Sequence, residues 1–310
     1  MMTHRETFTE VLAPGTCGEL IQGTCEGVDF LVTCPIARFV RARVRRVSAR
    51  EGVTVQFRRP VGRKVQRAVE AVVQRMQPPG PMHVELELDG RLPRGKGLAS
   101  STAEIVAVVA ALLGAYGRRA TPLLLARIAA GIEPSDGLMF PGIVAFAHRR
   151  GRLLQAFGPP PDLDVFIFDT GGRVDTIAFN RRADLARLNA AKEPEVREAL
   201  ALLREGMRRR DAAAVAQAAT HSAFAHQRIL PKPGLETLPQ HLSATGGLGL
   251  CVAHSGTVVG LLYPAGAGAD PTLIRYLRRH VAARWLGATR LIGGGVRYVT
   301  HGVRPAGPRR

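Results

Sequence analysis

Residues 92–103 read Leu92-Pro93-Arg94-Gly95-Lys96-Gly97-Leu98-Ala99-Ser100-Ser101-Thr102-Ala103, and an apolar, alanine-rich run follows to about Leu113. The length and composition of that run predict a buried helix. Its first backbone N–H groups have no partner inside the helix, and the small residues before it let an anion approach them. The helix dipole also favours negative charge there. These residues predict a phosphate site, with an ordinary loop capped by Ser100 as the alternative.

Two common phosphate motifs do not occur in the chain. There is no GxxxxGK[ST] sequence, and no GxGxxG follows a strand in a βαβ unit. A P-loop ATPase and a Rossmann nucleotide site are therefore disfavoured.

The pattern Pro93-x-x-x-Gly97-Leu98-Ala99-Ser100-Ser101-Thr102-Ala103 resembles the second motif of the GHMP small-molecule kinases, Pro-x-x-x-Gly-Leu-Gly-Ser-Ser-Ala. Ala99 stands where glycine is usual, and Thr102 stands where alanine is commoner. Alanine at position 99 is tolerable if its φ is negative, because alanine is strained at positive φ. Two more segments are similar to family motifs: residues 13–20 to the N-terminal motif beside the acceptor site, and residues 245–251 to the glycine-rich C-terminal motif.

The expected fold class is α+β. A chain of 310 residues exceeds the size at which one core stops growing, so two closely packed lobes are expected. The resemblance implies a two-lobed GHMP kinase fold. Residues 1–155 would form the N-terminal lobe, with a mixed or antiparallel sheet, helices and the phosphate loop. Residues 156–310 would form an α/β-plait-like C-terminal lobe, beginning near the proline-rich residues 158–161.

Hydrophobic periodicity predicts the elements of each lobe. In the first lobe, strands are expected at 30–36, 39–47 and 83–88, with helices at 63–76 and from Pro122 to about Gly131. In the second, strands are expected at 165–168, 251–253 and 258–263, and helices at 184–209 and 211–228. The basic tail from Arg304 is expected to be frayed.

Residues 14–23, 92–103 and 132–136 are similar to family members that phosphorylate the side-chain hydroxyl of L-threonine. This resemblance implies ATP-dependent formation of O-phospho-L-threonine for the aminopropanol arm of cobalamin. The same scaffold acting on homoserine or another small alcohol remains an alternative, because the phosphate loop does not contact the acceptor. A third alternative is a basic, nucleic-acid-binding member that has lost catalysis.

The resemblance also implies roles for individual residues. Ser101 and Glu133 match the hydroxyl and the carboxylate that hold Mg²⁺, and Asp136 is the candidate base or orienting group for the acceptor hydroxyl. Glu19 is the candidate partner of the threonine ammonium, and Thr16, Cys17 and Gly18 are expected to line its pocket. ATP binding is assigned to the whole loop: Pro93, Arg94, Gly95, Lys96, Gly97, Leu98, Ala99, Ser100, Ser101, Thr102 and Ala103. Gly246, Gly247 and Gly249 are expected either to bring the backbone close to the nucleotide or the phosphate loop, or to form a plain tight turn between a helix and a strand.

Charge and composition narrow the partners. Forty-three basic and 25 acidic residues give a net charge of +18, which attracts phosphate-bearing partners of any kind. Aromatic residues are only 5% of the chain, which disfavours nucleic-acid binding by base stacking. The four cysteines form no CxxC pair, so neither a zinc site nor a disulfide is expected. With no signal peptide or membrane span expected, the predicted location is the cytoplasm and the predicted partners are ATP and L-threonine; a homodimer is left open.

Overall fold

The computed structural model describes residues 8–47, 53–76, 82–90 and 92–299, and its described strands form one curled sheet. Strands run in the order β10-β7-β9-β8-β1-β2-β4-β3, while β11 pairs with β1, β5 with β2, and β6 with β5. The strands are β1 (Phe8–Cys25), β2 (Val28–Arg46), β3 (Val53–Phe57), β4 (Met82–Gly90), β5 (Ile143–Ala147), β6 (Arg152–Gly158), β7 (Leu163–Asp169), β8 (Gly249–Val252), β9 (Val258–Pro264), β10 (Arg284–Arg290) and β11 (Arg297–Val299). The expected α+β fold class is confirmed, and the sheet is mixed because β3 is parallel to β4.

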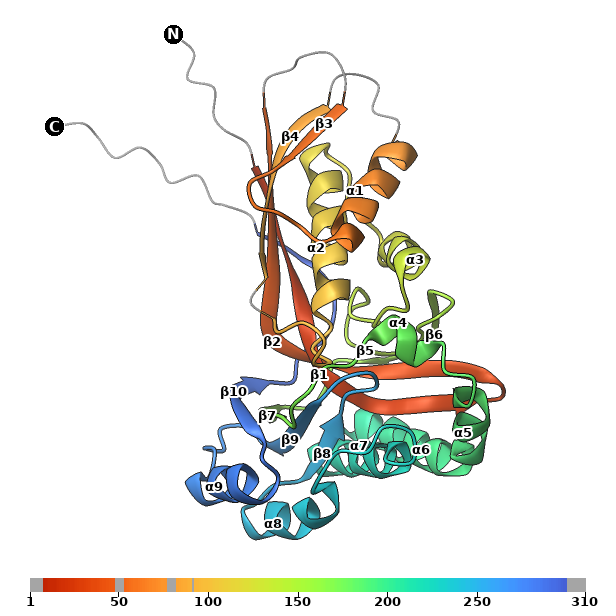
Figure 1. Cartoon of the computed structure of the whole chain (residues 1–310), viewed down its shortest axis with the longest axis vertical. Helices are drawn as coiled ribbons and strands as arrows, with labels where there is room; N and C mark the ends of the chain where they lie inside the picture. Colours follow the sequence, from red (N-terminus) through yellow and green to blue (C-terminus); the bar gives the residue numbers. More distant parts are fainter. Residues whose placement is uncertain (1–7, 48–52, 77–81, 91, 300–310) are drawn as a thin grey trace, which may run out of the picture.

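The helices pack against the sheet, and Figure 1 shows two groups of them clearly. They are α1 (Arg63–Met76), α2 (Ser100–Ala115), α3 (Pro122–Ile132), α4 (Thr176–Asn180), α5 (Leu185–Ala191), α6 (Glu193–Arg209), α7 (Ala212–His226), α8 (Leu238–Ala244) and α9 (Pro271–His280). In Figure 1, α1, α2 and α3 lie beside the upper part of β1 and β2, and α6 and α7 lie below the lower part. Among the described residues, no helix is both long enough and apolar enough to cross a bilayer.

Most predicted elements of the first half are confirmed. Helix α1 has the predicted bounds, because Val65, Ala68, Val69 and Val72 face the core at helical spacing. The two strands expected at 30–36 and 39–47 are one continuous strand, β2. The predicted tail from Arg304 lies outside the described residues.

One predicted helix is divided. Residues 184–209 form α5 and α6, with Lys192 between them at φ −103° and ψ 3°. Pro194 stands two residues later, in the first turn of α6. Proline has no N–H to continue the preceding helix and its ring clashes with the carbonyl four residues earlier, so a single helix through this point is wrong.

The strands β1 and β2 take part in both halves of the core. Val11 and Val40 pack with α2 in one hydrophobic cluster, whereas Leu20 and Val32 pack with residues of α6 and α7 in a second. The expected division between residues 155 and 156 falls inside β6. The two-lobe division at that position therefore stays a prediction.

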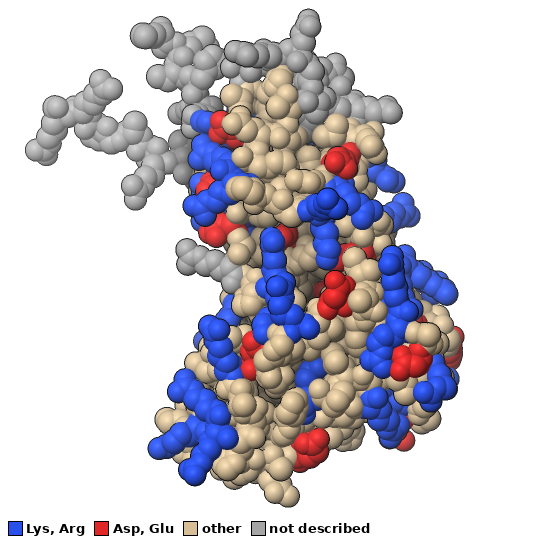
Figure 2. Space-filling model, viewed as in Figure 1, with Lys and Arg blue, Asp and Glu red and all other residues tan. Residues whose placement is uncertain are grey.

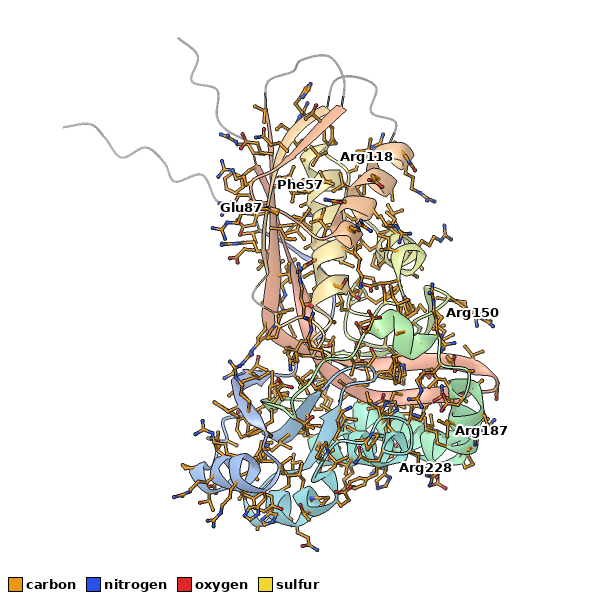
Figure 3. The ribbon with its side chains drawn as sticks, viewed as in Figure 1. Phe57, Glu87, Arg118, Arg150, Arg187 and Arg228 are labelled. Atoms are coloured by element: carbon orange, nitrogen blue, oxygen red, sulfur yellow. The ribbon has the colours of Figure 1, made fainter. Side chains whose placement is uncertain are left out.

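The solvent-facing side of β2 carries much of the basic charge. Arg41, Arg43 and Arg45 point outward and form ion pairs with acidic residues, at 3.3 Å with Asp89, 2.8 Å with Glu10 and 2.8 Å with Glu85, respectively. Figure 3 shows Glu87 among them on this outer side. Arginine thus alternates with apolar residues in β2 because one face of the strand is exposed to solvent and the other is buried.

Candidate active site

A cavity of about 390 Å³ lies against the N-terminus of α2. Arg94, Gly95, Gly97, Leu98, Ala99, Ser100, Ser101 and Thr102 line it, together with Glu19, Glu133 and Asp136. The fold thus brings most of the predicted site residues together from three distant segments. Figure 2 shows acidic side chains near the middle of the molecule, with basic side chains to the left and to the right of them.

The phosphate loop ends in a strained residue. Ala99 is the N-cap of α2 with φ 54° and ψ 27°, in the left-handed region, and makes no side-chain cap hydrogen bond. The condition of a negative φ at this position is therefore not met, and alanine occupies a conformation that favours glycine. No residue of the first turn of α2 is acidic, and the carboxylate beside that turn is Asp136, which contacts Thr102 from outside the helix.

Backbone hydrogen bonds from β1 hold the loop that precedes α2. The N–H groups of Thr16 and Gly18 in β1 donate to the carbonyls of Leu98 and Gly97, both at 3.1 Å. From the other side, the turn between β8 and β9 approaches so closely that a Cβ on Gly97 would lie 2.2 Å from that of Ala253. The loop is therefore positioned by the N-terminal motif and by this turn.

The structure corrects the expectation for Thr16, Cys17 and Gly18. They are absent from the cavity wall: Thr16 and Cys17 are buried, and a Cβ on Gly18 would lie 2.4 Å from the Val252 backbone. The strand β1 is irregular here, with a register shift against β2 between Thr16 and Glu19 and a positive φ of 60° at Gly18, and only Glu19 of this segment lines the cavity. A hydrogen bond with Cys251 and burial raise the pKa of the Cys17 thiol well above its ordinary value, which disfavours a nucleophilic thiolate.

The glycine-rich residues 245–251 form the plain turn that was one of the two expectations. Gly246, with φ 79°, ends α8, and a Cβ on Gly249 would lie 2.3 Å from the carbonyl oxygen of Ala216 in α7. This segment therefore packs strand β8 against α7.

Lys96 does not face the cavity. Its Nζ lies 2.6 Å from Asp169 Oδ2 and donates to the carbonyl of Gly172 at 2.6 Å. Pro93 and Ala103 also lie outside the cavity wall. The Lys96 side chain is thus tethered to the end of β7, and its assignment to ATP binding stays a prediction. Arg94 lines the cavity and binds Glu104 at 2.8 Å.

Glu133 caps the C-terminal end of α3 in an extended conformation, and Pro134 follows it. Its carboxylate is buried, with Oε2 paired to Lys64 and Oε1 without a hydrogen-bond partner. The turn after it is fixed because the N–H of Ser135 donates to the carbonyl of His148 at 3.1 Å. One carboxylate oxygen of Glu133 is thus left for a ligand.

Asp136 lies beside a second carboxyl group. Its Oδ2 accepts from the Thr102 hydroxyl at 3.4 Å, which ties it to the first turn of α2. Burial and the charge of Glu133 raise the pKa of Asp136 to about 6. Burial and the charge of Asp136 raise the pKa of Glu19 well above its ordinary value. Burial and the neighbouring charge therefore favour the protonated form of Glu19, while Asp136 ionises near pH 6.

The cavity residues that were not predicted include two histidines. His148 follows β5 and His254 follows β8, both are buried, and both line the cavity. Figure 3 shows Arg150, two residues beyond His148, pointing away from the molecule. The available signal was weak: each histidine comes directly after a buried apolar run, 143–147 and 249–253, where a strand ends.

Comparisons with known proteins identify the family of this chain. The family "GHMP kinases N terminal domain" matches residues 63–142. The chain is 33% identical to an L-threonine kinase of Salmonella typhimurium over 251 residues, covering 80% of this chain and 81% of that protein. The chain belongs to the GHMP kinases. An L-threonine kinase of Citrobacter freundii is 30% identical, covering 80% of this chain and 84% of that protein.

Solved structures show the same GHMP kinase fold. The homoserine kinase of Cytophaga hutchinsonii superimposes with a TM-score of 0.66 at 16% identity, covering 96% of this chain and 99% of that one. This GHMP kinase is thus a small-molecule phosphotransferase, and the predicted family and fold are confirmed.

Proposed function

We propose that this GHMP kinase transfers the γ-phosphate of ATP to the side-chain hydroxyl of L-threonine. The observation that carries the proposal is the cavity that joins the α2 N-terminus to the carboxylate of Asp136. The two L-threonine kinases, each matched over 80% of the chain, support threonine as the acceptor. The product, O-phospho-L-threonine, would supply the aminopropanol arm of cobalamin.

In this reaction the threonine oxygen forms a bond to the γ-phosphorus while the bond from that phosphorus to the β,γ-bridging oxygen breaks, releasing ADP. The N–H groups at the start of α2 would stabilise the negative charge of the phosphates. Asp136, with a pKa of about 6, is mostly ionised at neutral pH and would either accept the hydroxyl proton or orient the hydroxyl.

The residues fit a Mg²⁺ site that ATP completes. Glu133 has an unpartnered, buried Oε1, and Ser101 lines the same cavity. Across the described part of the chain, no three His, Cys, Asp or Glu side chains gather as a metal site. Ser101 and Glu133 would therefore supply one or two ligands, and Mg²⁺ would neutralise phosphate charge when bound.

The test is ADP formation from ATP and Mg²⁺ with L-threonine, D-threonine, L-serine, L-homoserine or mevalonate as acceptor. We expect turnover with L-threonine above all others. Glu133→Ala should abolish it, whereas Glu205→Ala, which removes a surface carboxylate paired with Arg208, should not. Absence of ADP formation with L-threonine would overturn the proposal.

A further inference from the structure

His148 and His254, which line the cavity, each contain one imidazole nitrogen without a hydrogen-bond partner. These nitrogens are Nδ1 of His148 and Nε2 of His254, and both atoms are buried. The two rings meet edge to face, with centroids 5.3 Å apart. A buried polar atom without a partner costs free energy. A ligand that donates hydrogen bonds to these two nitrogens would remove that cost.

The partners of His148 fix which of its nitrogens carries the proton. Nε2 lies 3.3 Å from Oδ1 of Asn180. The Asn180 amide is oriented by its own Nδ2, which donates to the carbonyl of Thr176 at 2.8 Å. Asn180 Oδ1 therefore accepts, His148 Nε2 donates, and His148 Nδ1 is left with a free lone pair.

The same reasoning applies to His254. Its Nδ1 lies 3.1 Å from Oε1 of Gln22, whose Nε2 donates to the carbonyl of Val252 at 3.2 Å. Gln22 Oε1 therefore accepts and His254 Nδ1 donates, which leaves a lone pair on Nε2. Both unpartnered nitrogens are thus hydrogen-bond acceptors.

A buried network behind His254 holds it in place. The carbonyl of His254 accepts from His226 Nε2 at 3.0 Å, and His226 Nδ1 accepts from Lys192 Nζ at 3.1 Å. Lys192 Nζ also donates to the carbonyl of Gln22 at 3.0 Å. His254 and Gln22 are therefore positioned by residues that do not line the cavity.

Both cavity histidines are neutral. Burial lowers the pKa of His148 to about 4, and burial with the nearby His148 and His226 lowers the pKa of His254 well below its ordinary value. Each ring therefore keeps its lone pair throughout the neutral pH range.

We propose that His148 Nδ1 and His254 Nε2 accept hydrogen bonds from the α-ammonium group of the acceptor and thereby select amino acids over other small alcohols. This assignment rests on the proposed kinase function. An ammonium group carries three donors and no acceptor, so it complements two acceptors better than a hydroxyl or a carboxylate does. Glu19, with an unpartnered Oε2 in the same wall, would add a third acceptor.

The experiment compares L-threonine with (R)-3-hydroxybutyrate, which has the same hydroxyl and carboxylate but no ammonium. KM for L-threonine and the inhibition constant of (R)-3-hydroxybutyrate are measured for the wild type, His148→Leu and His254→Leu. Loss of a hydrogen bond to a charged group should raise KM for L-threonine at least about tenfold in each variant. The inhibition constant of (R)-3-hydroxybutyrate and KM for ATP should stay within about threefold of the wild-type values, the scatter expected where no contact is lost.

Rescue variants separate recognition from folding. His148→Asn keeps an acceptor oxygen near the Nδ1 position and His254→Gln keeps one near the Nε2 position, so both should recover part of the affinity for L-threonine. The exposed His221 on α7 provides the matched control, His221→Asn, with no expected change. Melting temperatures and KM for ATP report whether each variant is folded.

The outcomes distinguish this inference from the proposed function. If the wild type phosphorylates L-threonine but the leucine variants leave its KM unchanged, or weaken both ligands equally, the ammonium site is overturned and the kinase proposal stands. If the wild type uses L-homoserine instead, and the leucine variants weaken L-homoserine, the ammonium site is supported and the threonine proposal is overturned.

Discussion

The carbonyl oxygen of Lys96 accepts a hydrogen bond from the backbone N–H of Val258 at 2.9 Å. The same oxygen accepts from Thr257 at 2.9 Å, so the phosphate loop is joined to the turn between β8 and β9. The position of the loop therefore depends on a segment that contributes few side chains to the cavity. Substitutions in that turn should change catalysis indirectly.

Gly256→Ala tests this dependence. A Cβ on Gly256 would lie 2.4 Å from the Lys96 backbone, so the loop must shift. We expect kcat/KM to fall on the order of 10- to 100-fold. The control is Gly246→Ala, whose Cβ would meet no atom within 4 Å and which is strained only by φ 79°. Equal kinetic losses in the two variants would contradict this view of the turn.

Ala99→Gly should stabilise the protein. Glycine relieves the left-handed strain at φ 54° but adds freedom to the unfolded chain, so the net gain is about 0.5–1 kcal/mol. Ala282→Gly is a matched control, because exposed Ala282 has φ 50° far along the chain. Denaturant unfolding should show similar gains for both, and a loss in Ala99→Gly would show that the alanine methyl group matters more than the strain.

Asp136 should control the acid limb of the pH profile. With a pKa of about 6, it loses its charge as pH falls through 6, so kcat/KM should fall there. Asp136→Asn should reduce kcat about 10²- to 10⁴-fold and remove this limb. If the residual kcat/KM of Asp136→Asn still falls as pH decreases through 6, another group causes the fall.

The same residue should weaken the fold above pH 6. Its folded pKa is raised from 3.8, so the folded state holds this proton more tightly, and the stability gained is lost as pH rises from about 4 to about 6. At pH 8, Asp136→Asn should therefore melt at a higher temperature than the wild type. A lower melting temperature would contradict the burial cost that we assign to this carboxylate.

Two buried lysines should make stability rise with pH. Burial lowers the pKa of Lys192 and of Lys232 from 10.5 to about 7, and these residues are 0% and 2% exposed. Because the unfolded chain then binds more protons, stability increases between about pH 7 and 10.5. The gain from pH 7 to 9 should be on the order of 2–5 kcal/mol.

Denaturant unfolding at pH 7 and pH 9 checks this slope. The double variant Lys192→Met/Lys232→Met should flatten it, whereas Arg208→Met, at an exposed ion pair, should leave it intact. An equally steep slope in the double variant would assign the pH dependence to other groups.

Sequence reasoning predicted the loop that precedes α2 and the helices around it. It succeeded at α1 and at the start of α2 because both depend on local signals, apolar periodicity in one and small residues before an apolar run in the other. It missed the length of β1, whose interior contains Pro14, Gly15, Gly18 and Gly23. Those residues indicate a loop locally, and only pairing with β2, β8 and β11 makes the segment a strand.

The acceptor side of the cavity was harder to predict. Glu19 was identified with its neighbours, but the irregular stretch of β1 between Thr16 and Glu19, which no local signal predicts, leaves Thr16 buried and Glu19 in the cavity wall. His148 and His254 are far apart in sequence and share no spacing motif. Their juxtaposition follows from the paths of β5 and β8, which depend on long-range strand pairing.

The central position of β1 has a consequence for how the protein is made. One side of β1 pairs with β2, which follows directly, but the other side waits for β8 and β11, in the last third of the chain. At about 5–20 residues per second, a ribosome needs on the order of 10–50 s to reach them. Throughout that interval the backbone N–H and C=O groups along that edge of β1 have no strand partner, so the sheet of the N-terminal half stays open to pairing with other chains until the last third is made.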